Sequence, residues 1–168
     1  MPVLHKLPIR LRPRDPVFGA TIGANNLQWG SVVKILVIDD SNTIRKTAES
    51  LLARAGHQVS SAADGFESLA KIADDPPDLI FVDIMMPRLD GYQTCALIKN
   101  NRRFRSIPVV MLSSKDGLFD KARGRIVGAD AYLTKPFGRQ DLLDVIDRMA
   151  EAQRSTATVG TVGTPTDT

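Results

Sequence analysis

Residues 79–87 read LIFVDIMMP, an apolar run that contains a single acid, Asp83, and ends on Pro87. Such a run, rich in β-branched and aromatic residues, is typical of a strand covered on both faces, as the central strands of parallel sheets are. Proline has no backbone N–H to donate, so the strand is expected to stop before Pro87. In open α/β sheets, ligands bind beyond the carboxyl ends of the strands. Asp83 is therefore predicted to lie at the mouth of a sheet, within reach of a ligand.

The same kind of strand recurs along the chain, each time followed by a helix-forming stretch. Further strands are predicted at residues 32–38, 57–62, 107–112 and 131–134. Helices are predicted to start after Ser41, Asp64 and Asp90, and to occupy about 115–127 and 139–152. Five successive βα units indicate the α/β class, with a doubly wound, five-stranded parallel sheet of the flavodoxin-like kind and right-handed crossovers.

The composition is that of a soluble globular protein, with 43% hydrophobic and 24% charged residues among 168. The single cysteine, Cys95, excludes an internal disulfide and a thiolate metal cluster, and is read as a small packing residue. No apolar segment approaches the length of a membrane span, and the N-terminus lacks the apolar core of a secretory signal. A cytoplasmic protein without membrane insertion is therefore expected.

The charge is unevenly distributed and divides the chain into three regions. Residues 34–168 carry 18 basic and 18 acidic side chains, so the net charge of +3 comes from residues 1–33. That N-terminal extension is expected to be disordered, and it is either a basic arm for a membrane or partner, or a stretch without function. Residues 34–150 form the predicted domain, and 151–168 a disordered tail. The basic run at residues 100–105 is read as a solvated loop, and no nucleic-acid-binding core is indicated.

Polar residues follow four of the five predicted strands. They are Asp39 and Asp40, Asp83, Ser113, and Lys135. If strands one, three, four and five are neighbours, three carboxylates meet one ammonium and one hydroxyl group. Crowded carboxylates raise one another's pKa unless a cation joins them, and an all-oxygen set with few protein ligands suits Mg²⁺. Asp83 is then a candidate nucleophile for a phosphoryl group, with the metal and Lys135 neutralising the transferring oxygens and Ser113 donating a hydrogen bond to them.

These positions resemble the motifs of the response regulator receiver domains. The segment VIDDS at 37–41 is similar to the acidic pair of that family, and FVDIMMPRLDG at 81–91 to its phosphoacceptor signature. Ser113 matches the Ser/Thr switch position and Tyr132 the aromatic switch. Lys135-Pro136 matches the family's lysine and following proline, whose peptide bond is cis. The resemblance covers about residues 34–150, with the motifs in the right order, and implies the (βα)5 receiver fold.

The resemblance also implies roles for the acidic residues. Asp40, Asp83 and the backbone carbonyl of Met85 would bind Mg²⁺ directly, and Asp39 mostly through water. Asp83 would accept phosphate from the histidine of a kinase or phosphotransfer domain.

A phosphorylated receiver would then change its surface. Ser113 would move toward the phosphate and Tyr132 would turn inward, altering the face formed by Lys115–Val127, Ala131–Thr134 and Arg139–Ala152. The resemblance extends to receivers of type IV pilus twitching-motility chemosensory systems. It therefore implies that the downstream partner is a pilus-motor or scaffold protein.

Other functions fit the sequence less well. A phosphohydrolase of the haloacid-dehalogenase type needs a second Asp two residues after the nucleophile, where this chain has Met85. A pseudo-receiver scaffold that takes no phosphate is disfavoured by the complete set of acids, serine and lysine. Dinucleotide binding would need a Gly-rich loop after the first strand. Since residues 151–168 are too few for an output domain, we predict a stand-alone signalling module, not an enzyme or a DNA-binding regulator.

Overall fold

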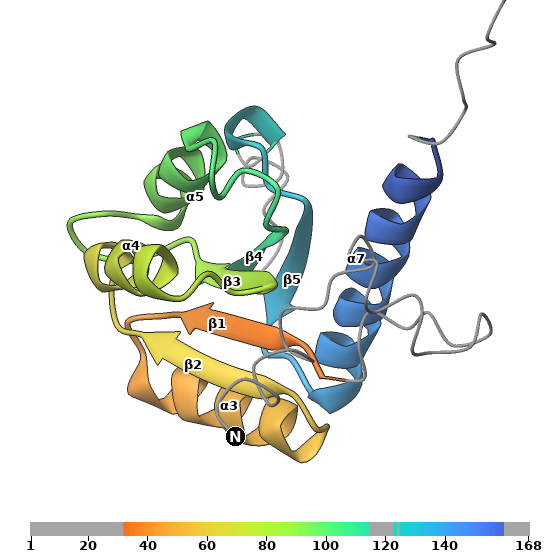
Figure 1. Cartoon of the computed structure of the whole chain (residues 1–168). Helices are drawn as coiled ribbons and strands as arrows, with labels where there is room; N and C mark the ends of the chain where they lie inside the picture. Colours follow the sequence, from red (N-terminus) through yellow and green to blue (C-terminus); the bar gives the residue numbers. More distant parts are fainter. Residues whose placement is uncertain (1–31, 115–122, 124, 160–168) are drawn as a thin grey trace, which may run out of the picture.

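Five parallel strands form one sheet in the computed structural model, which describes residues 32–114, 123 and 125–159 (Figure 1). The strands are β1 (Lys34–Ile38), β2 (Gln58–Ala62), β3 (Leu79–Asp83), β4 (Val109–Ser114) and β5 (Ala131–Lys135). Their order across the sheet is β2-β1-β3-β4-β5, and every neighbouring pair is parallel. The helices are α3 (Asn42–Arg54), α4 (Gly65–Asp74), α5 (Gly91–Asn100) and α7 (Arg139–Val159). The predicted α/β class and parallel sheet are confirmed.

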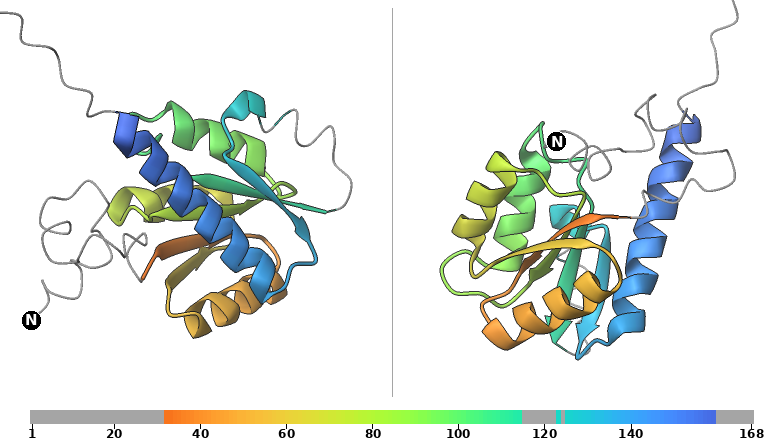
Figure 2. Two further views of the ribbon diagram at one scale, coloured as in Figure 1. Left: turned by 90° about the vertical axis from the view of Figure 1, so that its right-hand side faces the viewer. Right: turned by 60° about the horizontal axis from the view of Figure 1, so that its bottom comes forward.

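Helices cover both faces of the sheet, α3 and α7 on one and α4 and α5 on the other (Figure 2). Successive strand residues point to opposite faces, so each strand contributes to two cores. In β3, for example, Phe81 joins the core under α3 and α7, while Ile80 and Val82 join the core under α4 and α5. All five residues of β3 are buried. This explains why the strand reads as a continuous apolar run and why Asp83 at its end is held rigidly.

Helix starts close to the carboxyl edge are fixed by side-chain caps. Ser41 caps α3 and Asp64 caps α4. At α5, the Asp90 carboxylate accepts from the Gln93 N–H at 2.8 Å, and the Gln93 side chain accepts from the Asp90 N–H at 3.0 Å, a complete capping box. Three helices therefore begin at defined residues on the same side of the molecule as Asp83.

The first strand begins at Lys34, two residues later than predicted, and the last helix extends beyond the predicted 139–152. Val33 is buried in the core, and its carbonyl accepts the N–H of Gln58 at 3.0 Å, so packing begins before the first strand. The last helix continues to Val159, past the expected start of the tail at residue 151. Residues 151–154 are good helix formers, and lengthening an existing helix costs far less than starting one.

Two expectations fall largely outside the described residues. The N-terminal extension is described only at residues 32 and 33, and the helix predicted at about 115–127 only at 123 and 125–127, which are helical. Among the residues that are described, no helix is long and apolar enough to cross a membrane.

Candidate functional site

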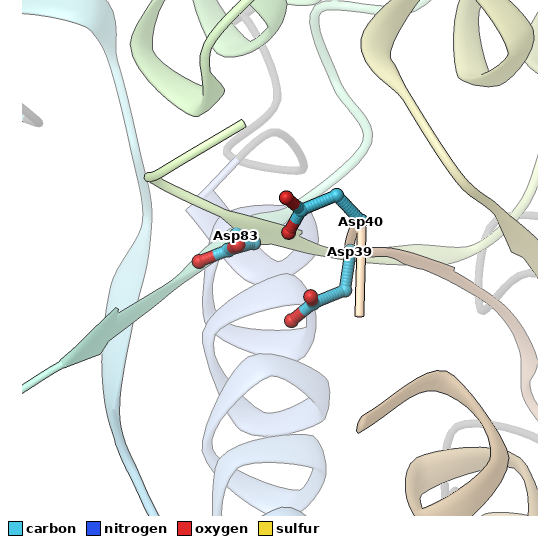
Figure 3. Close-up of side chains that lie close together, drawn as sticks. All are labelled: Asp39, Asp40 and Asp83. Atoms are coloured by element: carbon cyan, nitrogen blue, oxygen red, sulfur yellow. The ribbon is translucent and has the colours of Figure 1, made fainter. Parts of the chain in front are cut away.

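The strand order places the ends of β1, β3, β4 and β5 side by side, which is the condition on which the predicted acid cluster depended. Carboxylate oxygens of Asp39, Asp40 and Asp83 lie within 4.8 Å of one another. Figure 3 shows these side chains at the adjacent ends of β1 and β3. From β5, the Lys135 Nζ lies 2.6 Å from an Asp39 oxygen and 3.1 Å from an Asp83 oxygen. We call these four residues the acid cluster.

Asp39 is the structural member of the acid cluster. Its side chain is fully buried, one oxygen accepts the Ser41 N–H at 2.9 Å, and the other accepts from Lys135. Its backbone carbonyl accepts the Arg45 guanidinium at 2.6 Å. Asp40 is exposed, and no described residue forms a hydrogen bond or ion pair with its carboxylate. The two neighbouring acids therefore differ, since Asp39 is committed to protein contacts and Asp40 is open to a ligand.

Asp83 carries an unfavourable charge. It is 5% exposed, and burial followed by the charge of Asp39 raises the pKa of its carboxyl to about 6, although Lys135 and the Met85 N–H oppose this. Burial lowers the pKa of Lys135, but its hydrogen bonds to Asp39 and Asp83 and their charges outweigh burial and raise it. Lys135 therefore stays protonated, and its one ammonium group pairs with two of the three carboxylates.

This donor set fits a magnesium ion. It offers only oxygen atoms, its negative charge exceeds its positive charge, and Asp40 remains open to solvent, as suits an ion that keeps several waters. A bound cation would relieve the repulsion that raises the pKa of Asp83.

The remaining predicted residues lie at different depths. Ser113 is buried on β4, one residue beyond Leu112, the β4 partner of Asp83 in register. Tyr132 pairs with Met111 and packs, half-buried, against the core under α4 and α5. The structure thus brings Ser113 to the site edge, while Tyr132 lies further along the strands. The Lys135-Pro136 peptide bond is cis, as the family resemblance implied.

Two residues at the site were not singled out from the sequence. A Cβ on Gly91 would lie 2.3 Å from the Asp83 carbonyl oxygen, so only glycine allows α5 to start against the end of β3. Arg45 reaches back from α3 to the Asp39 carbonyl. The Asp90-Gly91 pair signalled a helix start, but a close approach between segments has no sequence signal of its own.

Comparison with known proteins identifies this arrangement. The family described as the response regulator receiver domain matches residues 35–147. Over 119 residues the chain is 70% identical to Protein PilG of Pseudomonas aeruginosa, covering 71% of this chain and 88% of that protein. The chain belongs to the response regulator receiver family. A receiver domain is a signalling module that works with a histidine kinase or phosphotransfer partner.

Other receivers share the fold at lower identity. The chemotaxis protein CheY4 of Vibrio cholerae superimposes with a TM-score of 0.68 at 34% identity, covering 70% of this chain and 98% of that one. The regulatory protein PhoP of Bacillus subtilis is 41% identical over 109 residues, which cover 65% of this chain and 45% of PhoP. The match to PhoP thus takes in less than half of that longer protein.

Proposed function

We propose that this receiver accepts a phosphoryl group on Asp83 and that phosphorylation changes its contacts with other proteins. The observation that carries the proposal is the placement of the Asp83 carboxylate. It is held at the end of a buried strand, 3.1 Å from the Lys135 ammonium and beside two further acids. A positioned carboxylate next to a fixed cation suits attack on a phosphorus atom and stabilisation of the charge that develops.

In the proposed step, an Asp83 carboxylate oxygen attacks the phosphorus of a phosphohistidine. The P–O bond forms as the P–N bond breaks, and the electron pair of that bond stays on the imidazole nitrogen of the donor. The carboxylate must be ionised to attack. Lys135 donates hydrogen bonds to the site and offsets part of the negative charge on the transferring oxygens.

The residues that would hold Mg²⁺ are Asp40, Asp83 and the Met85 carbonyl, with Asp39 acting through water. The occupied oxygens of Asp39 and the open carboxylate of Asp40 support this division. When bound, the ion would supply positive charge to the oxygens of the transferring group. The protein would meanwhile hold Asp83 in place through the buried strand and the Gly91 contact.

The proposed switch uses Ser113 and Tyr132. Ser113 would bond the attached phosphoryl group, and Tyr132 would turn inward, altering the face made by Lys115–Val127, Ala131–Thr134 and Arg139–Ala152. The high identity to PilG supports a role in type IV pilus twitching-motility signalling, with a pilus-motor or scaffold protein as the downstream partner. We also propose that the protein works in the cytoplasm, which its single cysteine fits.

Intact-mass spectrometry tests the proposed function. The purified chain is incubated with Mg²⁺ and acetyl phosphate, alongside Asp83→Asn and the surface control Asp144→Asn. We expect a gain of one phosphoryl group in the wild type and in Asp144→Asn, its loss with a chelator, and none in Asp83→Asn. A folded wild type that gains no mass would contradict the proposal and favour a scaffold that takes no phosphate.

A further inference from the structure

The zero net charge of residues 34–168 conceals a strong separation of charge. Residues 99–125 contain eight basic and two acidic residues, whereas the rest of that region contains ten basic and sixteen acidic residues. Within the basic segment, three arginines fall in one short loop between α5 and β4. We call Arg102, Arg103 and Arg105 the arginine loop.

The arginine loop is a fixed turn. The Asn101 carbonyl accepts the N–H groups of Phe104 and Arg105 at 3.0 and 2.9 Å, and its side chain accepts the N–H of Arg103 at 2.9 Å. Phe104 is 6% exposed and anchors the turn in the core. Side chains on such a turn lose little backbone freedom when they bind.

Lys99 stabilises this turn, and its charge is paired within the fold. Its Nζ donates to the carbonyls of Arg105 and Ile107 at 3.3 and 2.8 Å, and to the Asp130 carboxylate at 2.7 Å. Asp130 also accepts the N–H of Val109 at 2.8 Å. We call Lys99 and Asp130, with these backbone partners, the lysine corner.

The three arginines themselves point their charge outward. All are exposed, and the guanidinium of Arg103 lies over the Phe104 ring at 5.0 Å. Within the described part of the chain, no carboxylate pairs with Arg102 or Arg105. The charge of Lys99 is therefore neutralised within the fold, whereas the charges of the arginine loop are available to a partner.

The arginine loop lies far from the acid cluster. α5 starts against Asp83 and is ten residues long, which places its far end about 15 Å away. The helical residues 125–127 end where Gly128 packs on Lys99, beside α5 (Figure 1). Residues 125–127 belong to the segment that the proposed switch would alter, whereas the arginine loop lies outside that segment.

We propose that the arginine loop is a docking surface for a carboxylate-rich segment of another protein. The planar fork of arginine matches a carboxylate with two parallel hydrogen bonds, and a rigid turn makes that geometry repeatable. A membrane surface would need only charge density, which flexible lysines supply equally well. The surface is separate from the phosphoacceptor edge, so both can be occupied at once. Binding here does not depend on phosphorylation.

Fluorescence anisotropy with a labelled polyglutamate peptide tests the proposal on the whole chain at low salt. The test variant is Arg102→Glu with Arg105→Glu, which keeps the Arg103–Phe104 contact and every backbone bond of the turn. The matched control is Lys46→Glu with Arg54→Glu, two exposed basic residues on α3, which changes the net charge equally. Flotation with vesicles of phosphatidylglycerol and phosphatidylcholine is run in parallel.

We expect the arginine-loop variant to bind the peptide about ten-fold more weakly, since each exposed charge pair contributes modestly. The α3 variant is expected to stay within about two-fold of the wild type, because only long-range charge is altered there. Both variants should accept phosphate like the wild type, which separates this test from that of the phosphoacceptor. Equal losses in the two variants, no peptide binding by the wild type, or vesicle binding without peptide binding would overturn the proposal.

Discussion

At the carboxyl edge of the sheet three carboxylates lie together and the ammonium group of Lys135 pairs with two of them, whereas at the amino edge the lysine corner pairs one ammonium with one carboxylate. Lys99 further bonds two carbonyls, and Asp130 accepts a backbone N–H, so each charge has its partners within the fold. The acid cluster keeps an excess of negative charge and an open carboxylate on Asp40.

The lysine corner has the contacts of polar groups that stabilise a fold, whereas the acid cluster has those of polar groups that suit a ligand. Buried charges are costly unless they are paired, and groups with strongly shifted pKa values gather at functional sites. The lysine corner could be built for stability alone. The acid cluster costs stability, because burial and the charge of Asp39 disfavour the ionised Asp83, and a bound cation would relieve that cost.

The largest expected effect concerns the glycines beside the two clusters. A Cβ on Gly91 would meet the Asp83 carbonyl at 2.3 Å, whereas one on Gly128 would meet the flexible Lys99 side chain at 3.3 Å. Gly91→Ala should therefore cost about 3 kcal/mol or more of unfolding free energy. Gly128→Ala should cost about 1–2 kcal/mol because its φ is +86°. Urea unfolding measures both, with Gly138→Ala, which has room for a Cβ, as the control. Equal costs for the first two would contradict the close contact at Gly91.

The second prediction is that removing one acid raises the unfolding free energy in the acid cluster and lowers it in the lysine corner. In metal-free protein at pH 7, Asp83→Asn should raise the unfolding free energy by about 2 kcal/mol, because it removes a charge that burial and Asp39 disfavour. Asp130→Asn should lower it by about 1–2 kcal/mol, because it weakens charged hydrogen bonds from Lys99 and Val109. If both substitutions lower the unfolding free energy, the charge of Asp83 does not destabilise the acid cluster and the prediction is wrong.

Magnesium should stabilise one cluster only. At about ten times its dissociation constant, Mg²⁺ should add about 1.4 kcal/mol to the unfolding free energy. Asp40→Asn should abolish this gain, whereas Asp130→Asn should keep it, as thermal unfolding at several Mg²⁺ concentrations would reveal. A gain that survives Asp40→Asn would place the ion elsewhere.

The smallest expected effect concerns His57, which lies at the amino edge of the sheet and belongs to neither cluster. Its Nδ1 accepts the Val33 N–H at 3.2 Å, and burial lowers its pKa below 6.5 against the opposing charge of Asp147. The unfolded chain therefore binds the proton more readily, and this contribution to stability is lost as the pH falls below 6.5. Asp83 titrates in the same pH range, and its contribution to stability changes with pH in the opposite direction, because its pKa is raised on folding. The wild type should thus lose stability relative to His57→Asn between pH 7 and pH 5; a constant difference in urea unfolding would contradict this.

The sequence predicts the acid cluster well because every member lies at, or directly after, the carboxyl end of a strand. The carboxyl ends of parallel strands converge, so Asp39, Asp83 and Lys135 could be brought together from strand positions alone. Contacts across the chain were beyond such reasoning. The close approach of Gly91 to Asp83 and the reach of Arg45 to the Asp39 carbonyl depend on how helices dock, which no local pattern encodes. The arginine loop read as solvated because the anchoring by Phe104 and Lys99 arises only in the folded chain.

Chemical trapping of the phosphorylated residue tests the central claim most directly. Borohydride reduces an aspartyl phosphate to homoserine, so the chain is treated with acetyl phosphate and Mg²⁺, reduced, and digested with trypsin. We predict homoserine at residue 83, within peptide 72–88. Homoserine within peptide 35–45, which carries Asp39 and Asp40, or at another acid of peptide 72–88, would contradict the assignment of Asp83 as the phosphoacceptor.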